Sequence, residues 1–233
     1  MTSKSSKNSQ KIALSLGILI LLTSAFLFFL PHSTSAPNVR TYLQKIDEEI
    51  QTMLKEDPSL GYRSNPYLYI KNNPSYEALI AEGTNVLPEL HQTLSESTED
   101  GLLEYITAIA IEEITRTDIR NSFSVSWETA KEFENSWTAF LTDVPQKIET
   151  LLSSSLSDQE KVQELQKYGL LAIPVLNRHM TTFSEDSPIF SYLAELVISD
   201  SESAFYTEDS LDQHTLEKMI NENYKTLIDY IYS

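Results

Sequence analysis

The stretch Gly83–Ile114 places the strongest constraint on how this chain can fold. Its first residue is a glycine, which can end a helix by entering the left-handed backbone conformation at little cost. Pro88 then falls in or just after the first turn of a new helix, where few backbone donors are needed. After the polar turn Ser95–Gly101, the apolar residues of 102–114 lie on nearly all sides of a third helix, which predicts neighbouring helices packed around it.

A weaker copy of the same pattern occurs 86 residues later, at Gly169–Ile198. When Gly83 is aligned with Gly169, Pro88 aligns with Pro174. Each copy reads as a helix, a glycine, a helix with an early proline, an acidic turn and a further helix. Glycine stops and early prolines are common in helical proteins, but their shared spacing, followed by a shared acidic turn, indicates a repeated unit.

The runs LIAEGTNVLPEL and, more weakly, LQKYGLLAIPVL resemble the glycine-then-proline helical hairpin of bacterial HEAT-like repeat proteins. The resemblance covers about Tyr76–Ile114 and Val162–Ile198, and the insert Thr115–Ser157, which bears both tryptophans, separates the two copies. HEAT units recur at about 40–47 residues, a shorter spacing than the one in this chain. The resemblance implies a binding scaffold without catalytic residues, with the hairpins packed as a short array or a compact bundle.

The remainder of residues 38–233 also carries helix signals, so the predicted fold class is all-α. Asn38 can cap a helix over Val39–Glu56, whose apolar residues recur at spacings of three and four. Ser59–Asn73 lacks this pattern and is expected to be irregular, and Arg116–Val125 reads as a polar connection. Other helices are predicted to start near Asn73, Ser126, Val144, Ser157 and Ser187, and a last helix is predicted from a capping box at Ser210 to Ile231.

Residues Ile12–Leu30 form a run of 19 residues without charge. As a helix the run would measure roughly 28 Å, close to the thickness of a bilayer core. Lys4, Lys7 and Lys11 precede it and no acidic residue does, which favours a cytoplasmic N-terminus. The sequence therefore predicts a single-pass protein of a cell membrane, with a cytoplasmic tail (1–11), a transmembrane anchor (12–30), a linker (31–37) and an acidic extracytoplasmic domain (38–233).

A cleavable signal peptide is the alternative interpretation, and it would make the protein secreted. The small residues Thr34, Ser35 and Ala36 suit a signal peptidase. The apolar run is longer than the usual signal-peptide core of about 7–15 residues, and Pro37 would follow directly after the cut. These two features favour the uncleaved anchor.

Charge and cysteine content exclude several functional classes. Residues 36–233 hold 14 basic and 34 acidic side chains, a net charge of −20. Such a field repels nucleic acid and anionic lipid headgroups and favours cationic partners. The chain has no cysteine, which excludes a disulfide framework, a thiol nucleophile and a thiolate metal site.

No catalytic, cofactor-binding or metal-binding residue is predicted. The four histidines form no metal-binding pair, and the domain contains no nucleophile motif or glycine-rich phosphate loop. Glu112 and Glu113 could supply a carboxylate pair, but neighbours on a helix point about 100° apart, so one should face solvent. The acidic segment Asp200–Asp212 lacks the ligand order of a calcium loop. An extracytoplasmic enzyme with an unrecognised carboxylate or serine site is the alternative function.

Aromatic side chains are the candidate contact residues. Trp127 and Trp137, together with Tyr62, Tyr67 and Tyr69 in the irregular segment, could form a peptide- or glycan-binding surface. Tyr67 and Tyr69 would point the same way if their segment is extended, whereas packing in the core is the alternative for all of these aromatics. The predicted function is a non-enzymatic, membrane-tethered interaction module that binds a protein or a cell-wall component through Tyr67, Tyr69, Trp127 and Trp137, without a cofactor.

Overall fold

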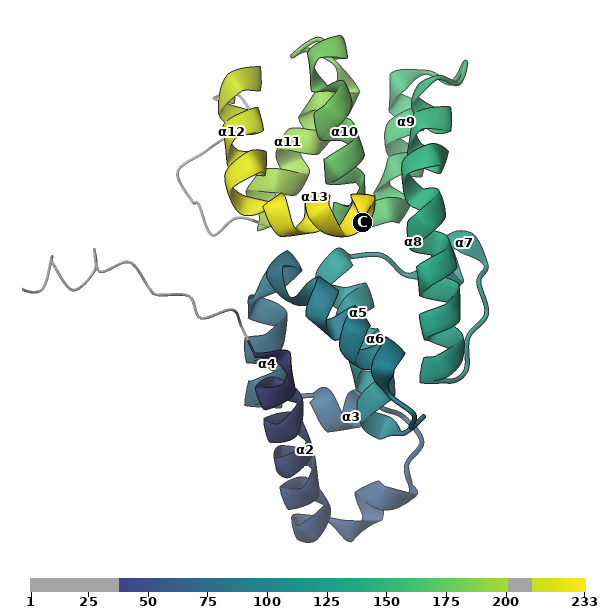
Figure 1. Cartoon of the computed structure of the whole chain (residues 1–233), viewed down its shortest axis with the longest axis vertical. Helices are drawn as coiled ribbons and strands as arrows, with labels where there is room; N and C mark the ends of the chain where they lie inside the picture. The colour runs from purple at the N-terminus through teal and green to yellow at the C-terminus, as the bar shows by residue number, and fades with distance from the viewer. Residues whose placement is uncertain (1–37, 201–210) are drawn as a thin grey trace, which may run out of the picture. The chain divides into compact units, whose positions relative to one another are not determined.

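The computed structural model describes residues 38–200 and 211–233, and every regular element in these ranges is a helix (Figure 1). The predicted all-α class is confirmed for these residues. The predicted tail (1–11), anchor (12–30) and linker (31–37) lie outside them, as does most of the acidic segment before the last helices. Within the described ranges, no helix combines the length and the apolar character needed to cross a membrane.

The described elements are α-helices and short 3-10 turns, the latter labelled η. In chain order they are α2 (Val39–Glu56), η1 (Pro58–Tyr62), α3 (Tyr67–Ile70), α4 (Pro74–Ala81), η2 (Gly83–Val86), α5 (Leu87–Glu96), α6 (Leu102–Thr115), α7 (Ile119–Phe123), α8 (Ala130–Leu152), α9 (Asp158–Leu165), η3 (Gln166–Ala172), α10 (Ile173–His179), η4 (Met180–Thr182), α11 (Pro188–Asp200), α12 (Gln213–Asn223) and α13 (Lys225–Tyr232).

Helix α2 follows the sequence prediction closely. The Asn38 side chain accepts a hydrogen bond from the Thr41 N–H at 3.1 Å and so caps the first turn. The buried residues recur at spacings of three and four along one face of the helix, which contacts α3, α4, α5 and α6. They are Val39, Leu43, Ile46 and Ile50.

The two copies inferred from the sequence have the same order of elements. The first is α4, η2, α5 and α6, and the second is α9, η3, α10 and α11, with the short turn η4 added between α10 and α11. Gly83 and Gly169 both have positive φ angles, of 61° and 50°, and Pro88 and Pro174 lie in the first turns of α5 and α10. In each copy the last helix packs against both preceding helices. The repeated spacing in the sequence therefore corresponds to a repeated order of local structure.

Gly169 also joins the second copy to the end of α6. A Cβ atom at this position would lie 2.2 Å from the Thr115 carbonyl oxygen and 2.5 Å from that of Arg116, far inside ordinary contact distance. Beside this approach, the Thr117 hydroxyl donates a hydrogen bond to the Tyr168 carbonyl oxygen at 2.8 Å. The two copies are thus linked by backbone contact, at a place that only glycine fits.

The two helices predicted near Ser126 and Val144 are a single helix, α8, which is a correction to the sequence analysis. Thr129 rather than Ser126 caps it, by accepting from the Glu132 N–H at 3.2 Å, and the helix continues through Pro145. Its apolar face is unbroken across the proline, and the burial of that face offsets the hydrogen bond that proline cannot donate. The buried residues are Phe133, Trp137, Phe140, Leu141, Val144 and Ile148. Helix α8 contacts helices of both copies, among them α5, α6, α9 and α10.

Three other segments differ from their predictions. The last helix is divided at Tyr224 into α12 and α13, because Tyr224 leaves helical geometry (φ −116°, ψ 18°) and donates a hydrogen bond to Asp200 at 2.9 Å. The turn lets α13 pack across α5, α8 and α10, as Figure 1 shows. Asp212 caps α12. The two segments expected to be irregular contain η1 with α3, and α7.

Candidate functional site

The four aromatic residues proposed as contacts have different surroundings. Trp137, Trp127 and Tyr69 are 0%, 3% and 6% exposed, whereas Tyr67 is 58% exposed. The structure therefore places three of the four in the core, the alternative considered from the sequence, and leaves Tyr67 at the surface. Tyr67 and Tyr69 lie in helix α3 rather than in an extended strand, so side chains two positions apart diverge.

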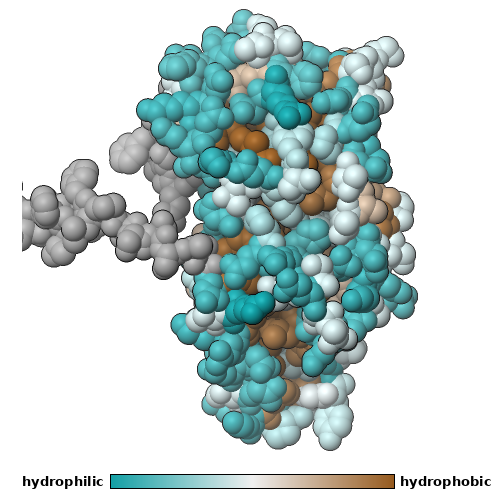
Figure 2. Space-filling model, viewed as in Figure 1, coloured by the Kyte–Doolittle hydropathy of each residue, from teal (hydrophilic) through white to brown (hydrophobic). Residues whose placement is uncertain are grey.

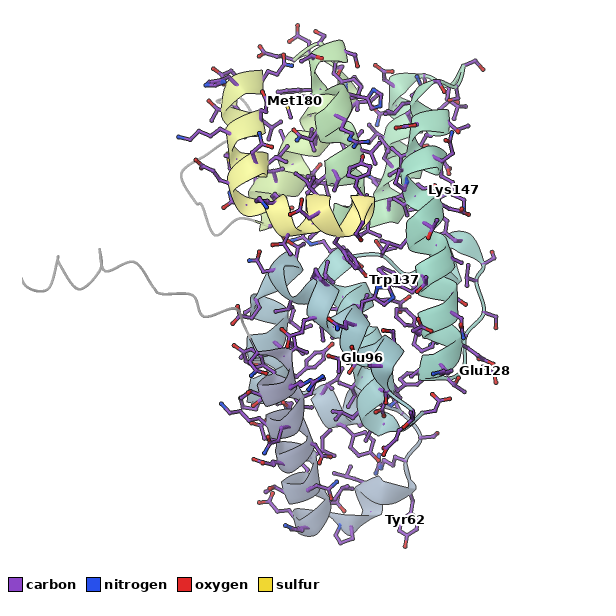
Figure 3. The ribbon with its side chains drawn as sticks, in the orientation of Figure 1. Tyr62, Glu96, Glu128, Trp137, Lys147 and Met180 are labelled. Atoms are coloured by element: carbon purple, nitrogen blue, oxygen red, sulfur yellow. The ribbon has the colours of Figure 1, made fainter. Side chains whose placement is uncertain are left out.

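Tyr69 holds the segment that exposes the other tyrosines. Its hydroxyl donates to the carbonyl oxygens of Leu60 at 2.7 Å and Arg63 at 3.1 Å, which fixes η1 against α3. Tyr62 is 93% exposed and projects outward at the lower end of the view in Figure 3. The buried Tyr69 thus fixes the segment from which Tyr62 and Tyr67 project into solvent.

Tyr67, Tyr105, Glu112, Arg120 and Trp127 form what we call the aromatic–arginine cluster. The Arg120 guanidinium carbon lies 3.5 Å above the Trp127 ring centre, within cation–π distance, and its Nη2 donates to the Tyr105 hydroxyl at 2.7 Å. The Tyr105 and Trp127 rings are 4.9 Å apart. Burial raises the pKa of the Tyr67 phenol, the Glu112 carboxylate raises it further and Arg120 lowers it, so Tyr67 lies in the field of both charged groups.

Glu112 is the group of this cluster whose protonation changes near neutral pH. Burial raises its pKa to about 7, although the hydrogen bond that its Oε1 accepts from the Ile119 N–H at 2.9 Å acts in the opposite direction. The carboxyl therefore exchanges its proton near pH 7. Its neighbour Glu113 is exposed and accepts a hydrogen bond from the Tyr76 hydroxyl at 2.6 Å. The two carboxylates thus diverge, as the sequence predicted.

A second polar cluster joins α5, α8 and α13. The Trp137 Nε1–H donates to the Tyr230 hydroxyl at 2.9 Å, and this hydroxyl lies 3.0 Å from His91 Nδ1. His91 Nε2 lies 3.0 Å from the Thr138 hydroxyl. Because the tyrosine oxygen already accepts from Trp137, its proton is directed to Nδ1, so Nε2 carries the remaining ring proton and donates to Thr138. His91 therefore cannot act as a base toward Thr138 in this arrangement, and the cluster is structural.

The aromatic–arginine cluster is suited to recognition. It combines an exposed phenol, a guanidinium held on an indole and a carboxyl that titrates near neutrality. Burial raises the pKa of Glu112, and a hydrogen bond from the buried Trp127 side chain acts in the opposite direction. The described residues also contain no group of three or more His, Asp or Glu side chains placed to hold a metal ion.

The sequence analysis identified Tyr67 and Trp127 but missed Tyr105 and Arg120. These four residues come from α3, α6, α7 and the segment before α8, and no spacing in the sequence joins them. Comparison of the chain with protein-family models, with curated proteins and with solved structures found no match.

Proposed function

We propose that this chain is a non-enzymatic interaction module whose partner docks on the surface formed by Tyr62, Tyr67 and the aromatic–arginine cluster. The distribution of charge carries the proposal. Residues 38–74 hold five basic and five acidic side chains and are neutral, whereas residues 75–233 hold nine basic and 29 acidic side chains. The exposed tyrosines thus belong to the neutral segment of a strongly acidic domain, where a partner that is not basic meets the least repulsion.

The proposal extends to the location and the scaffold of the module. The charge-free run 12–30 with its preceding lysines supports a bacterial protein tethered to the cell membrane, with residues 38–233 outside the cytoplasm. The shared element order of the two copies supports a rigid scaffold of HEAT-like hairpins. A protein or a cell-wall component is then the partner within reach.

Site-specific cross-linking tests the docking surface. A photoreactive phenylalanine analogue at position 67 should capture a partner in cells, whereas the same group at Leu156, which is 40% exposed in another part of the chain, should not. Replacing Tyr62 and Tyr67 together by Ala should then weaken binding of the captured partner at least about tenfold, because exposed tyrosines are frequent interface hot spots. Equal capture from both positions, or unchanged affinity of the double variant, would contradict the proposed surface.

A second candidate function is supported by Glu112. A carboxyl whose pKa is about 7, next to a guanidinium, has the protonation behaviour of a general acid or base. Glu112→Gln keeps an oxygen for the Ile119 N–H and removes the titratable proton. If the protein hydrolyses a peptide or a wall-derived substrate and this substitution abolishes turnover while the fold remains intact, the enzyme replaces the interaction module as the better explanation.

A further inference from the structure

Arg120 is held in one orientation within the aromatic–arginine cluster. Its guanidinium carbon lies 3.5 Å above the centre of the Trp127 ring, a distance that the group can reach only when it lies nearly flat on the ring. The N–H groups of a flat guanidinium point sideways, in its own plane. One of them donates to the Tyr105 hydroxyl at 2.7 Å. The guanidinium is therefore fixed on one face by the indole and at one edge by the phenol.

The charge of Arg120 has no partner in the described part of the chain. The side chain is exposed and makes no ion pair with the described residues. A guanidinium has five N–H donors, and the described residues use only the one that meets Tyr105. The planar fork of arginine suits a carboxylate, which it binds through two parallel hydrogen bonds. Arg120 thus offers an oriented cation to a group from outside the domain.

Two acidic residues near Arg120 are engaged with other groups. Asp118 caps α7, because its Oδ1 accepts from the Asn121 N–H at 2.9 Å and its Oδ2 from the Asn121 side chain at 2.6 Å. Glu112 accepts from the Ile119 N–H at 2.9 Å. Burial raises the pKa of Glu112 to about 7, so a large part of this carboxyl is uncharged at neutral pH. Neither carboxylate is therefore free to pair with Arg120.

The rest of the surface limits what kind of partner can meet Arg120. Hydrophilic residues cover most of the face drawn in Figure 2, and apolar residues show only in small areas between them. Residues 75–233 hold nine basic and 29 acidic side chains, so the domain repels a partner with many negative charges. A single carboxylate on an otherwise uncharged segment avoids most of this repulsion. An aromatic residue beside that carboxylate can pack on the exposed ring of Tyr67.

We propose that the partner of this surface presents one aspartate or glutamate side chain to Arg120, next to an aromatic residue that packs on Tyr67. The inference rests on the proposed function, because it gives the chemistry of the partner for the same surface. A basic segment is excluded by repulsion from Arg120, and an uncharged one leaves the guanidinium without a counter-charge.

Titration of the full-length protein with two matched peptides tests this inference. Acetyl-Tyr-Glu-amide should bind with a Kd of about 1 mM or below, and acetyl-Tyr-Gln-amide at least about tenfold more weakly. The indole N–H signal of Trp127 in ¹⁵N-correlated NMR spectra reports binding, because Arg120 lies on that ring. The indole signal of Trp137, which is 0% exposed, should not move.

Variants at position 120 separate recognition of charge from damage to the fold. Arg120→Gln should weaken binding of the glutamate peptide at least about tenfold. Arg120→Glu should reverse the preference toward acetyl-Tyr-Lys-amide, an outcome that a misfolded protein cannot give. Arg178→Gln is the matched control, because Arg178 also lies 3.5 Å from a ring centre, that of Tyr232. It removes the same charge and should leave binding unchanged.

The inference is overturned if no Trp127 shift occurs at about 10 mM glutamate peptide, if both peptides bind equally, or if Arg178→Gln weakens binding as much as Arg120→Gln. Equal binding of acetyl-Tyr-Gln with a free C-terminal carboxylate would overturn the choice of a side chain over a chain end. These results leave the proposed function intact as long as cross-linking at position 67 captures a partner. Failure of that capture counts against the proposed function whatever the peptides do.

Discussion

Gly83 and Gly169 occupy the same position in the two copies, yet they serve different physical purposes. Both have positive φ angles, a conformation that costs other residues about 1–2 kcal/mol. A Cβ atom at Gly83 would meet nothing within 4 Å, whereas at Gly169 it would overlap the carbonyl oxygens of Thr115 and Arg116. Gly83 is needed for its backbone angle alone, and Gly169 is needed for space as well.

We therefore expect unequal costs from the same substitution. Gly83→Ala should lower the free energy of unfolding by about 1 kcal/mol. Gly169→Ala should lower it by about 3 kcal/mol or more, because the α6 backbone must also move. Urea unfolding of the two variants at one pH measures the difference directly. Equal losses would mean that the close approach to Thr115 is relieved at no cost.

His91 gives the stability of the domain a specific pH dependence. Burial lowers the pKa of His91 below its usual value of 6.5, opposed by the nearby Glu134 carboxylate. The folded state thus binds fewer protons at this ring than the unfolded state does. The stability that the neutral ring contributes is complete above pH 6.5 and is lost as the pH falls from 6.5 through the lower folded pKa.

Tyr230→Phe tests both the hydrogen bonds and the titration of this cluster. The change leaves Trp137 Nε1 and His91 Nδ1 without their partner, which should cost about 1–3 kcal/mol at pH 7.5. Because Nδ1 then no longer accepts a hydrogen bond from Tyr230, the pKa of His91 should rise toward 6.5 and the loss of stability on acidification should shrink. Unfolding free energies of both proteins at pH 7.5 and 5.5 provide the comparison. A loss of stability on acidification that the substitution leaves unchanged would mean that burial alone, without the hydrogen bond from Tyr230, lowers the pKa of His91.

At the scale of elements, α8 shows how tertiary packing overrides a local signal. Val144 and Pro145 predict a helix start from the sequence alone, because proline cannot donate within a helix. In the structure, residues before and after it pack on the same core, and the helix continues. The stabilising burial involves residues on both sides of Pro145, so it cannot be predicted from the few residues next to the proline.

Pro145→Ala should consequently stabilise the protein. Alanine restores the donor that is missing from the middle of α8 and relieves the contact of the proline ring with the preceding turn. The looser unfolded chain offsets part of the gain, so we expect a net increase of about 1–2 kcal/mol in the free energy of unfolding. Thr142→Ala, an exposed change in the same helix, should stay within about 0.5 kcal/mol. A destabilised Pro145→Ala protein would show that α8 needs a bend here.

At the scale of the whole molecule, patterns local in sequence were the ones that could be predicted. The α2 bounds and the positive φ angles of both glycines follow from capping and periodicity within a few turns. The aromatic–arginine cluster could not be predicted, because Arg120 and Trp127 come together with Tyr105 only after α6 and α7 have folded. The hydrogen bond between Trp137 and Tyr230 spans 93 residues, and only the division of the last helix at Tyr224 brings α13 there. Contacts between residues so far apart in the sequence cannot be predicted from the spacing of residues along the chain.

The charge of the whole molecule leads to the last prediction. The full chain has a net charge of −17, and all of its acidic residues follow residue 36. Like charges held in a compact domain repel one another, and dissolved ions screen this repulsion within a Debye length of about 10 Å at 0.1 M salt.

Raising sodium chloride from about 0.02 M to 0.5 M should therefore raise the free energy of unfolding of the protein, even though it weakens the exposed ion pairs such as Arg40–Glu96. Urea unfolding over this salt series is the measurement, with choline chloride in place of sodium chloride to separate screening from specific sodium binding. If stability falls with salt in both series, attraction within the ion pairs outweighs repulsion across the domain, and the prediction is wrong.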